Sequence, residues 1–278
     1  MQVSSSLKWR ALSLAMKTPG QISDGIALGY RYGFDSGEML DYVYENRARG
    51  KFLLGALVDR VYLNTIGWRA IRTRKELLKA TLHRQIREIG SRNEQLVVLD
   101  VAAGPGRYLL EVCQELRAAG RGEAVQVVCR DLDTQGLALG RARAHRLGLE
   151  NVRYEWGDAT DAESLGSMQP RPDIVVVSGL YELFTDAAVI KRSMEAIYGI
   201  LKPGGTLIFT TQVTHPQLEL IANVLVNREG KPWEMVCRSV EEAEGLAREA
   251  GFEGMRSDLE RLGLFGVTVC RKSAGLRL

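Results

Sequence analysis

The sequence predicts an α/β protein in which a helical segment precedes a mostly parallel β-sheet. Two observations support this prediction. From Leu7 to Gly90 the apolar residues recur at helical spacing between glycine-containing turns, whereas after Gly90 short β-rich runs alternate with helix-patterned stretches. Such alternation is typical of parallel strands, because each needs a long crossover connection. At 278 residues we expect one large domain or a domain plus an appendage, rather than two full-size domains.

In two stretches of the helical segment, the residue pattern also indicates how the helix packs. The segment Leu7–Lys17 is apolar over much of its circumference. We expect it to pack on its own domain, and a membrane surface or a partner is the alternative. The longest predicted helix, Trp68–Ile89, has apolar residues on one side and Arg72, Lys75 and Lys79 on the other. We therefore expect one buried side and one solvated side.

Seven β-rich runs follow Gly90. They are Leu96–Leu99, Val125–Cys129, Val152–Trp156, Ile174–Val177, Thr206–Thr211, Phe252–Ser257 and Phe265–Cys270. Too few residues separate the last two runs for a helical crossover between them. The sheet is therefore expected to end in an antiparallel pair.

Composition excludes several classes of protein. Hydrophobic residues make up 45% and charged residues 26% of the chain, as in ordinary globular proteins, and no segment is apolar enough for a membrane-spanning helix. The four cysteines lack CxxC spacing, and Lys8 and Arg10 interrupt any signal-peptide core, so a cytoplasmic location is expected. Residues 1–95 contain 16 Lys+Arg against 9 Asp+Glu. Solvated helix faces explain this excess better than binding to nucleic acid or membrane does.

The most informative stretch joins the first strand to the next helix. Asp100 ends the strand, and Ala102, Ala103, Gly104 and Gly106 form a turn of small residues. Such a turn lets a ligand approach backbone amides at the start of a helix. Many α/β folds share this feature, so it does not identify a ligand by itself.

Carboxylates also follow the second and third strands. Asp131 is placed to accept hydrogen bonds from a ribose diol, and Asp158 to accept one from an exocyclic amine. Each of them alone is more often a turn or N-cap residue. Because ligands of open α/β sheets bind beyond the carboxyl ends of the strands, we expect Asp100, Asp131 and Asp158 to converge on one crevice.

These motifs resemble those of class I S-adenosylmethionine (SAM)-dependent methyltransferases over about residues 75–272. The landmarks are VVLDVAAGPG at 97–106, Asp131, GDA at 157–159, PDIVVVSGLYE at 172–182 and LKPGGTLIF at 201–209. Ala102 stands where the family usually has glycine, which is a small departure. The resemblance implies a Rossmann-like, seven-stranded, mostly parallel sheet with the last strand antiparallel. It also implies SAM as the cofactor and S-adenosylhomocysteine as the product.

The resemblance assigns the methionine and ribose parts of SAM to the first two strand ends. The loop from Ala102 to Gly106 would pass the methionine part, with Asp100 near its amino group. Asp131 would bind the ribose hydroxyls, with Leu132 beside it.

The adenine and the sulfonium are assigned to the next two strand ends. Asp158 and Ala159 would contact the adenine edge, and Ser178 and Gly179 would line the floor near the sulfonium. Methyl transfer from SAM requires no metal. The sequence shows no His, Asp and Glu cluster at ligand spacing, so no metal site is expected.

The front of the chain resembles a group of bacterial methyltransferases that are sometimes joined to an α/β-hydrolase domain. The matching stretches are GFDSGEMLDYVYENRARG at 33–50 and VYLNTIGWRAIRTRK at 61–75. We expect residues 1–75 to form a helical lid or substrate segment and residues 76–278 to form the SAM-dependent methyltransferase domain.

The expected lid needs residues that can cover a ligand. Tyr30, Arg31 and Tyr32 stand beside a glycine and are candidates for substrate binding, and a hinge between packed helices is the alternative. The insertion at 215–233 is expected to form a second wall of the acceptor site.

Three residues are candidates for catalysis because they follow strands four and five. His215 has a pKa range suited to a general base, and a surface histidine at a helix start is the alternative. Glu182 is placed to orient an amine or accept a proton, or else is a solvated carboxylate at a helix start. Tyr181 is either catalytic or part of the packing.

A methyltransferase acting on a small-molecule or lipid-like acceptor is the leading hypothesis. An RNA methyltransferase is disfavoured, because Ser178-Gly-Leu-Tyr181 replaces the (D/N/S)-P-P-(Y/F) motif of amino-methylating nucleic-acid enzymes. An NAD-dependent dehydrogenase is disfavoured, because Leu109 occupies the third glycine position of its fingerprint. A non-catalytic SAM-binding module and peripheral membrane contact stay open, and the sequence does not determine the oligomeric state.

Overall fold

The chain folds into two compact units. The computed structural model describes residues 2–90 and 95–275, and the side chains of residues 7–90, 95–122 and 124–275. Residues 74–214 and 236–278 form one unit, here called the sheet unit. Residues 1–73 and 215–235 form the other, here called the helical unit. The insertion after the fifth strand therefore belongs to the same compact unit as the front of the chain.

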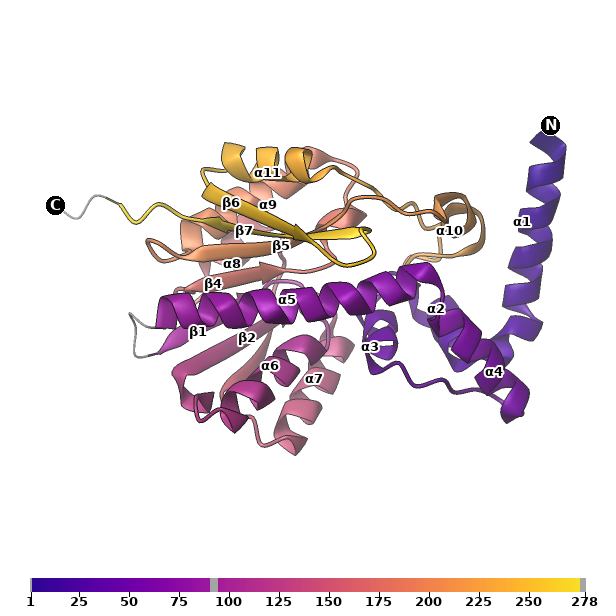
Figure 1. Ribbon diagram of the computed structural model, residues 1–278, viewed down its shortest axis with the longest axis horizontal. Coiled ribbons are helices and arrows are strands. Elements are labelled where there is room, and N and C mark those ends of the chain that lie inside the picture. The colour runs from indigo at the N-terminus through magenta and orange to yellow at the C-terminus, as the bar shows by residue number, and fades with distance from the viewer. Residues whose placement is uncertain (1, 91–94, 276–278) are drawn as a thin grey trace. The chain divides into compact units, whose positions relative to one another are not determined.

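The sheet unit is built on seven strands in the order β3-β2-β1-β4-β5-β7-β6 (Figure 1). The strands are β1 (Leu96–Asp100), β2 (Val125–Asp131), β3 (Val152–Trp156), β4 (Ile174–Val177), β5 (Thr206–Gln212), β6 (Glu253–Leu259) and β7 (Phe265–Arg271). Strands β1 to β5 are parallel, and β7 runs antiparallel to both β5 and β6. The predicted fold class, with its antiparallel last strand, is confirmed.

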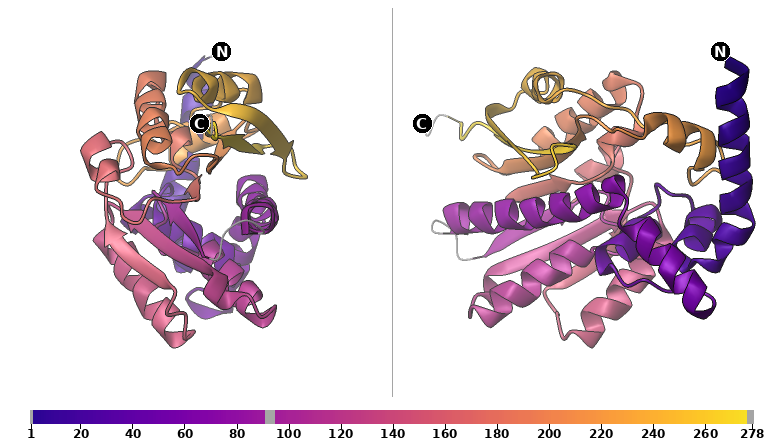
Figure 2. Two further views of the ribbon diagram at one scale, coloured as in Figure 1. Left: turned by 90° about the vertical axis from the view of Figure 1, so that its left-hand side faces the viewer. Right: turned by 45° about the vertical axis from the view of Figure 1, so that its right-hand side comes forward.

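Helices cover both faces of the sheet (Figures 1 and 2). One core cluster joins the sheet to α5, α6 and α7, and the other joins it to α8, α9 and α11. The bounds are α5 (Ile66–Gly90), α6 (Arg107–Ala118), α7 (Thr134–Arg146), α8 (Ala162–Gly166), α9 (Ala187–Ile200) and α11 (Val240–Glu249), with short 3-10 turns η2 (Gly122–Ala124) and η3 (Tyr181–Leu183). The central strands β1 and β4 are buried along their whole length, as expected for a sheet covered on both faces.

The charged side of α5 differs from the prediction. Lys75 and Lys79 were expected to be solvated, but only 8% and 9% of their surfaces are exposed. Both ammonium groups bind Glu111 on α6 at 2.9 Å, and Lys79 also binds Glu115 at 2.8 Å. The expectation was wrong because the helix pattern shows which side is polar but not whether an acidic helix faces it.

The helical unit consists of short helices connected by tight turns. They are α1 (Gln2–Lys17), η1 (Pro19–Ile22), α2 (Asp24–Tyr32), α3 (Gly37–Glu45), α4 (Phe52–Leu63), the first two turns of α5, and α10 (Leu218–Val224) from the insertion. Serine side chains cap two of them: Ser23 Oγ accepts the Ile26 N–H in α2, and Ser36 Oγ accepts the Met39 N–H in α3. Among the described residues, none of the helices has the length and apolar character needed to cross a bilayer.

A buried carboxylate connects the helices of this unit. Asp59 on α4 is fully buried. Its Oδ1 accepts hydrogen bonds from the Ser23 hydroxyl at 2.6 Å and the Gly25 N–H at 2.8 Å. Its Oδ2 accepts from the Tyr42 hydroxyl at 2.6 Å and the Arg49 N–H at 2.9 Å. One side chain thus ties α2, α3 and the turn before α4 together, and its charge is compensated by four donors.

Candidate functional site

The candidate site lies at the carboxyl ends of β1 to β4. These strands are parallel neighbours, so the residues that follow them meet at one edge of the sheet. The backbone joins the strand ends directly: the Ala103 N–H donates to the Arg130 carbonyl at 3.0 Å, and the Gly157 N–H donates to the Asp131 carbonyl at 3.1 Å.

The turn after β1 depends on its two glycines. Gly104 and Gly106 have positive φ angles of 51° and 67°, which L side chains rarely adopt. A Cβ at Gly106 would also lie 3.0 Å from Cys129 Sγ and 3.1 Å from the Tyr154 hydroxyl. At its two glycines the turn therefore carries no side chain, which leaves the backbone amides near the start of α6 approachable.

Asp100 is the buried member of the carboxylate group. Its side chain is fully buried, Oδ1 accepts the Ala102 N–H at 3.2 Å, and Oδ2 accepts the Tyr108 hydroxyl. Burial raises the pKa of Asp100 to about 7, although the hydrogen bond from Tyr108 opposes the shift. The charge of this residue therefore changes near neutral pH.

Asp131 joins the end of β2 to the glycine turn. Its Oδ2 accepts the Gly104 N–H at 2.7 Å, and its Oδ1 accepts the Asp133 N–H at 2.9 Å. The side chain is half-buried, and Leu132 next to it is half exposed. Each carboxylate oxygen accepts more than one hydrogen bond, so Asp131 keeps capacity for a ligand hydroxyl.

Asp158 and Ala159 follow β3 as expected. Asp158 Oδ1 accepts both the N–H and the hydroxyl of Thr160 at 2.7 Å, whereas Oδ2 has no hydrogen-bond partner among the described residues. Ala159 is buried, and its carbonyl accepts the Ser193 hydroxyl at 2.6 Å. The free oxygen of Asp158 is an acceptor suited to an amine.

The turn after β4 is held by a chain of hydrogen bonds. Gly179, next to the half-buried Ser178, donates its N–H to Thr210 Oγ1 at 2.9 Å. The Thr210 hydroxyl donates to Glu182 Oε1 at 2.8 Å, and Arg74 Nη1 lies 3.6 Å from the same oxygen. Glu182 is therefore a buried carboxylate, not the solvated one that the sequence left open.

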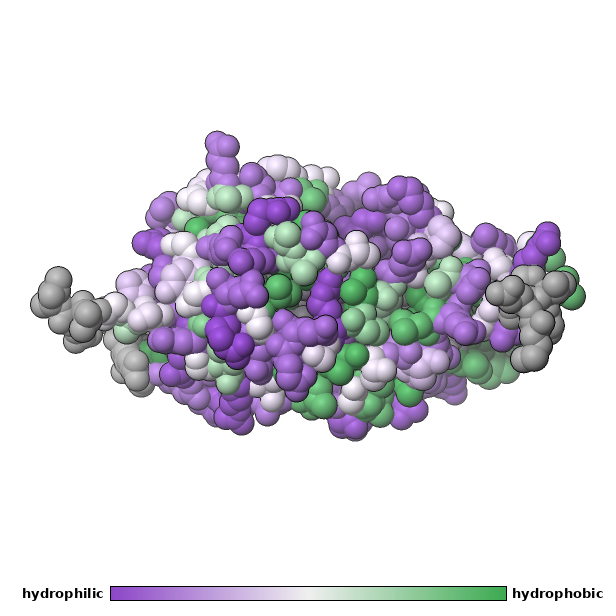
Figure 3. All heavy atoms as spheres, turned by 90° about the horizontal axis from the view of Figure 1, so that it is seen from above, coloured by the Kyte–Doolittle hydropathy of each residue, from purple (hydrophilic) through white to green (hydrophobic). Residues whose placement is uncertain are grey.

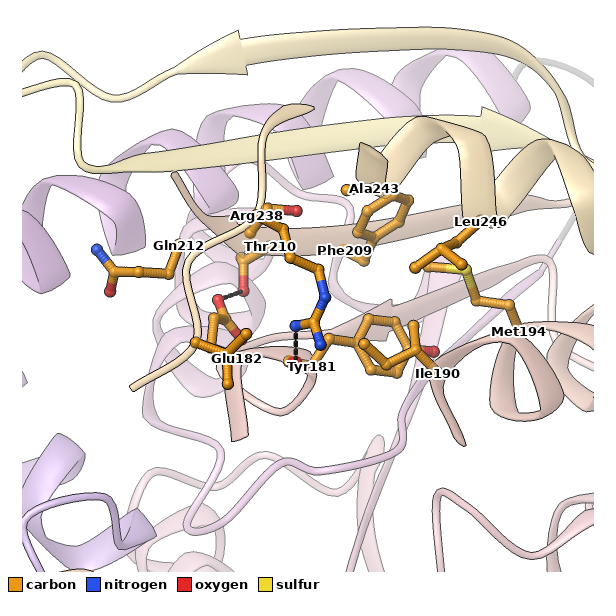
Figure 4. A pocket seen from close by; sticks show the side chains of 12 residues that line it. Tyr181, Glu182, Ile190, Met194, Phe209, Thr210, Gln212, Arg238, Ala243 and Leu246 are labelled. Atoms are coloured by element: carbon orange, nitrogen blue, oxygen red, sulfur yellow. Dashed lines mark hydrogen bonds between the residues drawn. The ribbon is translucent and has the colours of Figure 1, made fainter. Parts of the chain in front are cut away.

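The chemistry of Glu182 follows from this burial. Desolvation raises the pKa of Glu182, and the nearby Arg74 opposes the shift. Glu182 Oε2 has no hydrogen-bond partner among the described residues. Glu182 borders a small pocket between β5, α9 and α11 that is lined mostly by apolar side chains (Figure 4).

Tyr181 lies in the same pocket wall but is engaged in the core. Its hydroxyl is 3.1 Å from Ser193 Oγ, and its ring packs on Phe209 with the centroids 6.2 Å apart. The Tyr181 carbonyl accepts a hydrogen bond from Arg238 at 3.0 Å (Figure 4). These contacts favour the packing alternative, and a catalytic role for Tyr181 stays a prediction.

His215 belongs to the helical unit and is buried. Its Nδ1 accepts the Gln217 N–H at 3.1 Å, and its ring lies so close to Gly67 that a Cβ there would come within 2.6 Å of Nε2. Desolvation lowers the pKa of His215, so the ring is neutral at pH 7. Since Nδ1 is the acceptor, the neutral ring carries its proton on Nε2. This tautomer favours the structural alternative over a general base.

The three substrate candidates also lie in the helical unit, on α2. The Tyr30 hydroxyl donates to the Val224 carbonyl at 3.0 Å, and its ring meets Phe34 edge to face at 5.1 Å. The Arg31 guanidinium lies 5.0 Å from the centroid of the Tyr32 ring. Tyr30 thus packs α2 against α10, and substrate contacts by these residues stay predictions.

Several residues at the site were not singled out from the sequence. Tyr108 binds Asp100, and Thr210 and Arg74 hold Glu182. Tyr108 stands one residue into the helix after the glycine turn, a position from which its contact with the strand end could have been suspected. Arg74 and Thr210 are far from Glu182 in sequence, and nothing local signals their contact. Among the described residues, no group of three His, Cys, Asp or Glu side chains is placed to hold a metal ion.

The model of a protein family described as "Putative methyltransferase" matches residues 1–272. The chain is 40% identical over 265 residues to the uncharacterized protein YnbC of Escherichia coli, covering 95% of this chain and 44% of YnbC. The chain thus spans less than half the length of that relative. A ubiquinone/menaquinone biosynthesis C-methyltransferase from Pseudoalteromonas translucida is 32% identical over 126 residues, or 45% of each chain.

The fold also occurs among solved structures. A possible exported protein from Bordetella parapertussis superposes with a TM-score of 0.69, covering 86% of this chain and 80% of that one at 20% sequence identity. At that identity the likeness shows a shared fold. The family match covers both units, since residues 1–272 include the whole helical unit.

Proposed function

Because the chain belongs to the protein family described as "Putative methyltransferase", we propose that it transfers a methyl group from SAM to a small, lipid-like acceptor. It is a SAM-dependent methyltransferase of class I, with SAM as its cofactor. The identity of the acceptor is the part of the proposal that goes beyond the family.

One observation carries the cofactor assignment to these residues: Asp131 binds the glycine turn through the Gly104 N–H. This contact places a half-buried carboxylate against a turn of small residues, beside Asp100 at the end of the adjacent strand. Such an arrangement suits a ligand with a ribose diol and an amino group. Asp158, with its free Oδ2, supports the adenine assignment.

One observation supports a lipid-like acceptor. The relative from Pseudoalteromonas translucida acts, by its name, in ubiquinone and menaquinone biosynthesis, and quinones are apolar molecules with ring oxygens.

The protein contributes alignment rather than bond activation. SAM supplies an activated methyl group, and the displacement requires the acceptor atom in line with it. Asp131 and Asp100 would orient SAM, and the Glu182–Thr210 pair holds the Gly179 turn that would border the reacting centre. We therefore assign the buried Glu182 a positioning role: its Oε1 accepts the Thr210 hydroxyl and is paired with Arg74, and Thr210 in turn holds the Gly179 turn.

The proposal is tested by binding and by turnover. Calorimetry with SAM and S-adenosylhomocysteine reports cofactor binding, and release of S-adenosylhomocysteine reports turnover with a prenylated quinol, a short-chain phenol or a short RNA. We expect turnover with the quinol. Turnover with RNA alone would overturn the acceptor assignment but keep the cofactor site, and a chain that binds neither SAM nor S-adenosylhomocysteine would overturn both.

The affinity for SAM should depend on pH through Asp100. The pKa of Asp100 is raised to about 7, so the carboxyl is neutral below that pH and ionised above it. Only the ionised form attracts the amino group of the methionine part. We expect the dissociation constant of SAM to rise by up to about fivefold when the pH falls from 7 to 6, measured by calorimetry.

Asp100→Asn is the control for this pH dependence. The amide does not titrate, so the variant should bind SAM more weakly than the wild type at pH 8 and with the same affinity at pH 6 and pH 8. A wild-type affinity that is constant over this range would place the amino group away from Asp100.

A substitution can separate a catalytic role of His215 from its hydrogen bond with the Gln217 N–H. Asparagine keeps an oxygen that can accept the Gln217 N–H but has no titratable nitrogen. We therefore expect His215→Asn to retain kcat within about threefold, because the residue stabilises the start of α10. A loss of roughly 10²-fold in kcat with unchanged SAM affinity would instead show that His215 is the base.

A further inference from the structure

Helix α4 turns an apolar face to the solvent. Five large apolar residues on it are exposed: Phe52 at 88%, Leu53 at 92%, Leu54 at 61%, Leu57 at 58% and Val61 at 66%. Leu53, Leu57 and Val61 follow one another at four-residue spacing, so they form one stripe along the helix. We call these five residues the α4 face.

The opposite side of the same helix is buried and holds Gly55, Asp59, Tyr62 and Leu63. Asp59 and Tyr62 point into the helical unit, where Asp59 accepts its four hydrogen bonds. Both sides of α4 therefore carry apolar side chains, and Asp59 is the charged residue on its buried side. The position of Asp59 fixes this orientation, because turning the α4 face inward would expose Asp59 and release its donors.

The backbone before α4 also holds Phe52 outward. Phe52 has a φ of +58°, a left-handed conformation that is costly for an aromatic residue. The preceding turn is fixed by the Lys51 N–H, which donates to the Ile22 carbonyl at 2.8 Å, and by the Asp24 N–H, which donates to the Arg49 carbonyl at 3.1 Å. Phe52 is 88% exposed, so packing within the described chain does not compensate for the cost of this backbone conformation.

The surroundings of the α4 face are positively charged. From Asn46 to Thr73 the sequence contains one carboxylate, and it is the buried Asp59. Exposed cationic residues flank the face, and they are Arg47, Arg49, Lys51 and Arg60. Arg49 is paired with Glu45 at 2.5 Å and also interacts with the exposed Asp24, so the positive charge beside the face comes from Arg47, Lys51 and Arg60.

We propose that the α4 face docks on an anionic phospholipid surface. Apolar side chains inserted at the boundary of headgroups and acyl chains, with cations at the headgroups, are the means by which interfacial helices bind membranes. A second copy of the chain fits less well, because a two-fold contact through this face would bring the cationic residues of both copies together.

In the view of Figure 3, hydrophilic side chains predominate around α11, with hydrophobic ones between them. Scattered apolar residues are normal on soluble surfaces, whereas a contiguous group indicates an interaction site. The docking proposal does not depend on the identity of the methyl acceptor.

Flotation of the full chain with lipid vesicles tests the proposal. We expect it to float with vesicles of phosphatidylcholine and phosphatidylglycerol, to float much less with phosphatidylcholine alone, and to be released by salt. The double variant Leu53→Glu/Leu57→Glu should lower partitioning by at least about tenfold. Leu259→Glu is the matched control, because Leu259 is 54% exposed on β6 of the sheet unit and is not part of the α4 face, and its partitioning should equal that of the wild type.

Three outcomes would overturn the proposal. The wild type could stay in solution with either vesicle, or the double variant could float as well as the wild type. Sedimentation equilibrium could also show a wild-type dimer that the double variant converts to a monomer, in which case a second copy covers the α4 face. Calorimetry with SAM on the double variant serves as a check of folding, because none of these leucines belongs to the cofactor site.

Discussion

Asp131→Ala should weaken SAM binding by between tenfold and a hundredfold, about 1.4 to 2.8 kcal/mol. Two losses add up. The variant lacks the charged acceptor proposed for the ribose hydroxyls, and it also releases the Gly104 N–H, which Asp131 holds at 2.7 Å. Calorimetry with SAM and with S-adenosylhomocysteine measures the effect, which should be similar for both because they share the ribose.

Asp186→Ala is a matched control for this experiment. Asp186 caps α9, where it accepts the Ala188 N–H at 2.8 Å, so the variant also removes an aspartate that binds backbone. Its SAM affinity should equal that of the wild type. If Asp131→Ala binds SAM as tightly as the wild type, the ribose lies elsewhere and the proposed order of contacts along the sheet edge fails.

Asp59→Ala should destabilise the helical unit by about 3 kcal/mol or more. The substitution leaves four donors in a buried place without their acceptor, among them the hydroxyls of Ser23 and Tyr42. Hydrogen exchange followed by mass spectrometry reports the loss as faster exchange in peptides from α2, α3 and α4. The strands of the sheet unit serve as the internal reference.

Asp258→Ala is the control, because it removes a carboxylate that is not buried. Asp258 is partly exposed on β6 and makes ion pairs with Arg84 and Arg256 at 3.4 Å and 3.6 Å, which are worth little at a surface. Its effect should stay below about 1 kcal/mol. An equally small effect of Asp59→Ala would mean that water replaces the carboxylate, and that Asp59 does not determine how α4 is oriented.

The sequence was sufficient for the sheet and for the order of the strand-end residues proposed to bind the cofactor. Strand periodicity and turn chemistry are local, so the seven runs were found within two residues of their bounds. The carboxyl ends of parallel neighbouring strands must share an edge, so the meeting of Asp100, Asp131 and Asp158 at that edge follows from topology alone. The sequence motifs of the methyltransferase family, found in the right order, additionally indicated SAM as the ligand of this edge.

Other features were decided by contacts between residues far apart in the sequence. The burial of Lys75 depends on Glu111, and that of Glu182 depends on Arg74 and Thr210. Periodicity cannot show such pairs, because it reports which side of an element is polar and not what faces it.

The helical unit shows the same limit most clearly. The sequence by itself determined that residues before Gly90 are helical, but not that residues 215–235 join them in one compact unit. Nor did it determine which side of α4 is buried, since an apolar stripe ordinarily faces inward. Only the tertiary structure decided this, because four donors from α2, α3 and the turn before α4 stabilise the Asp59 charge inside and leave Leu53, Leu57 and Val61 outside.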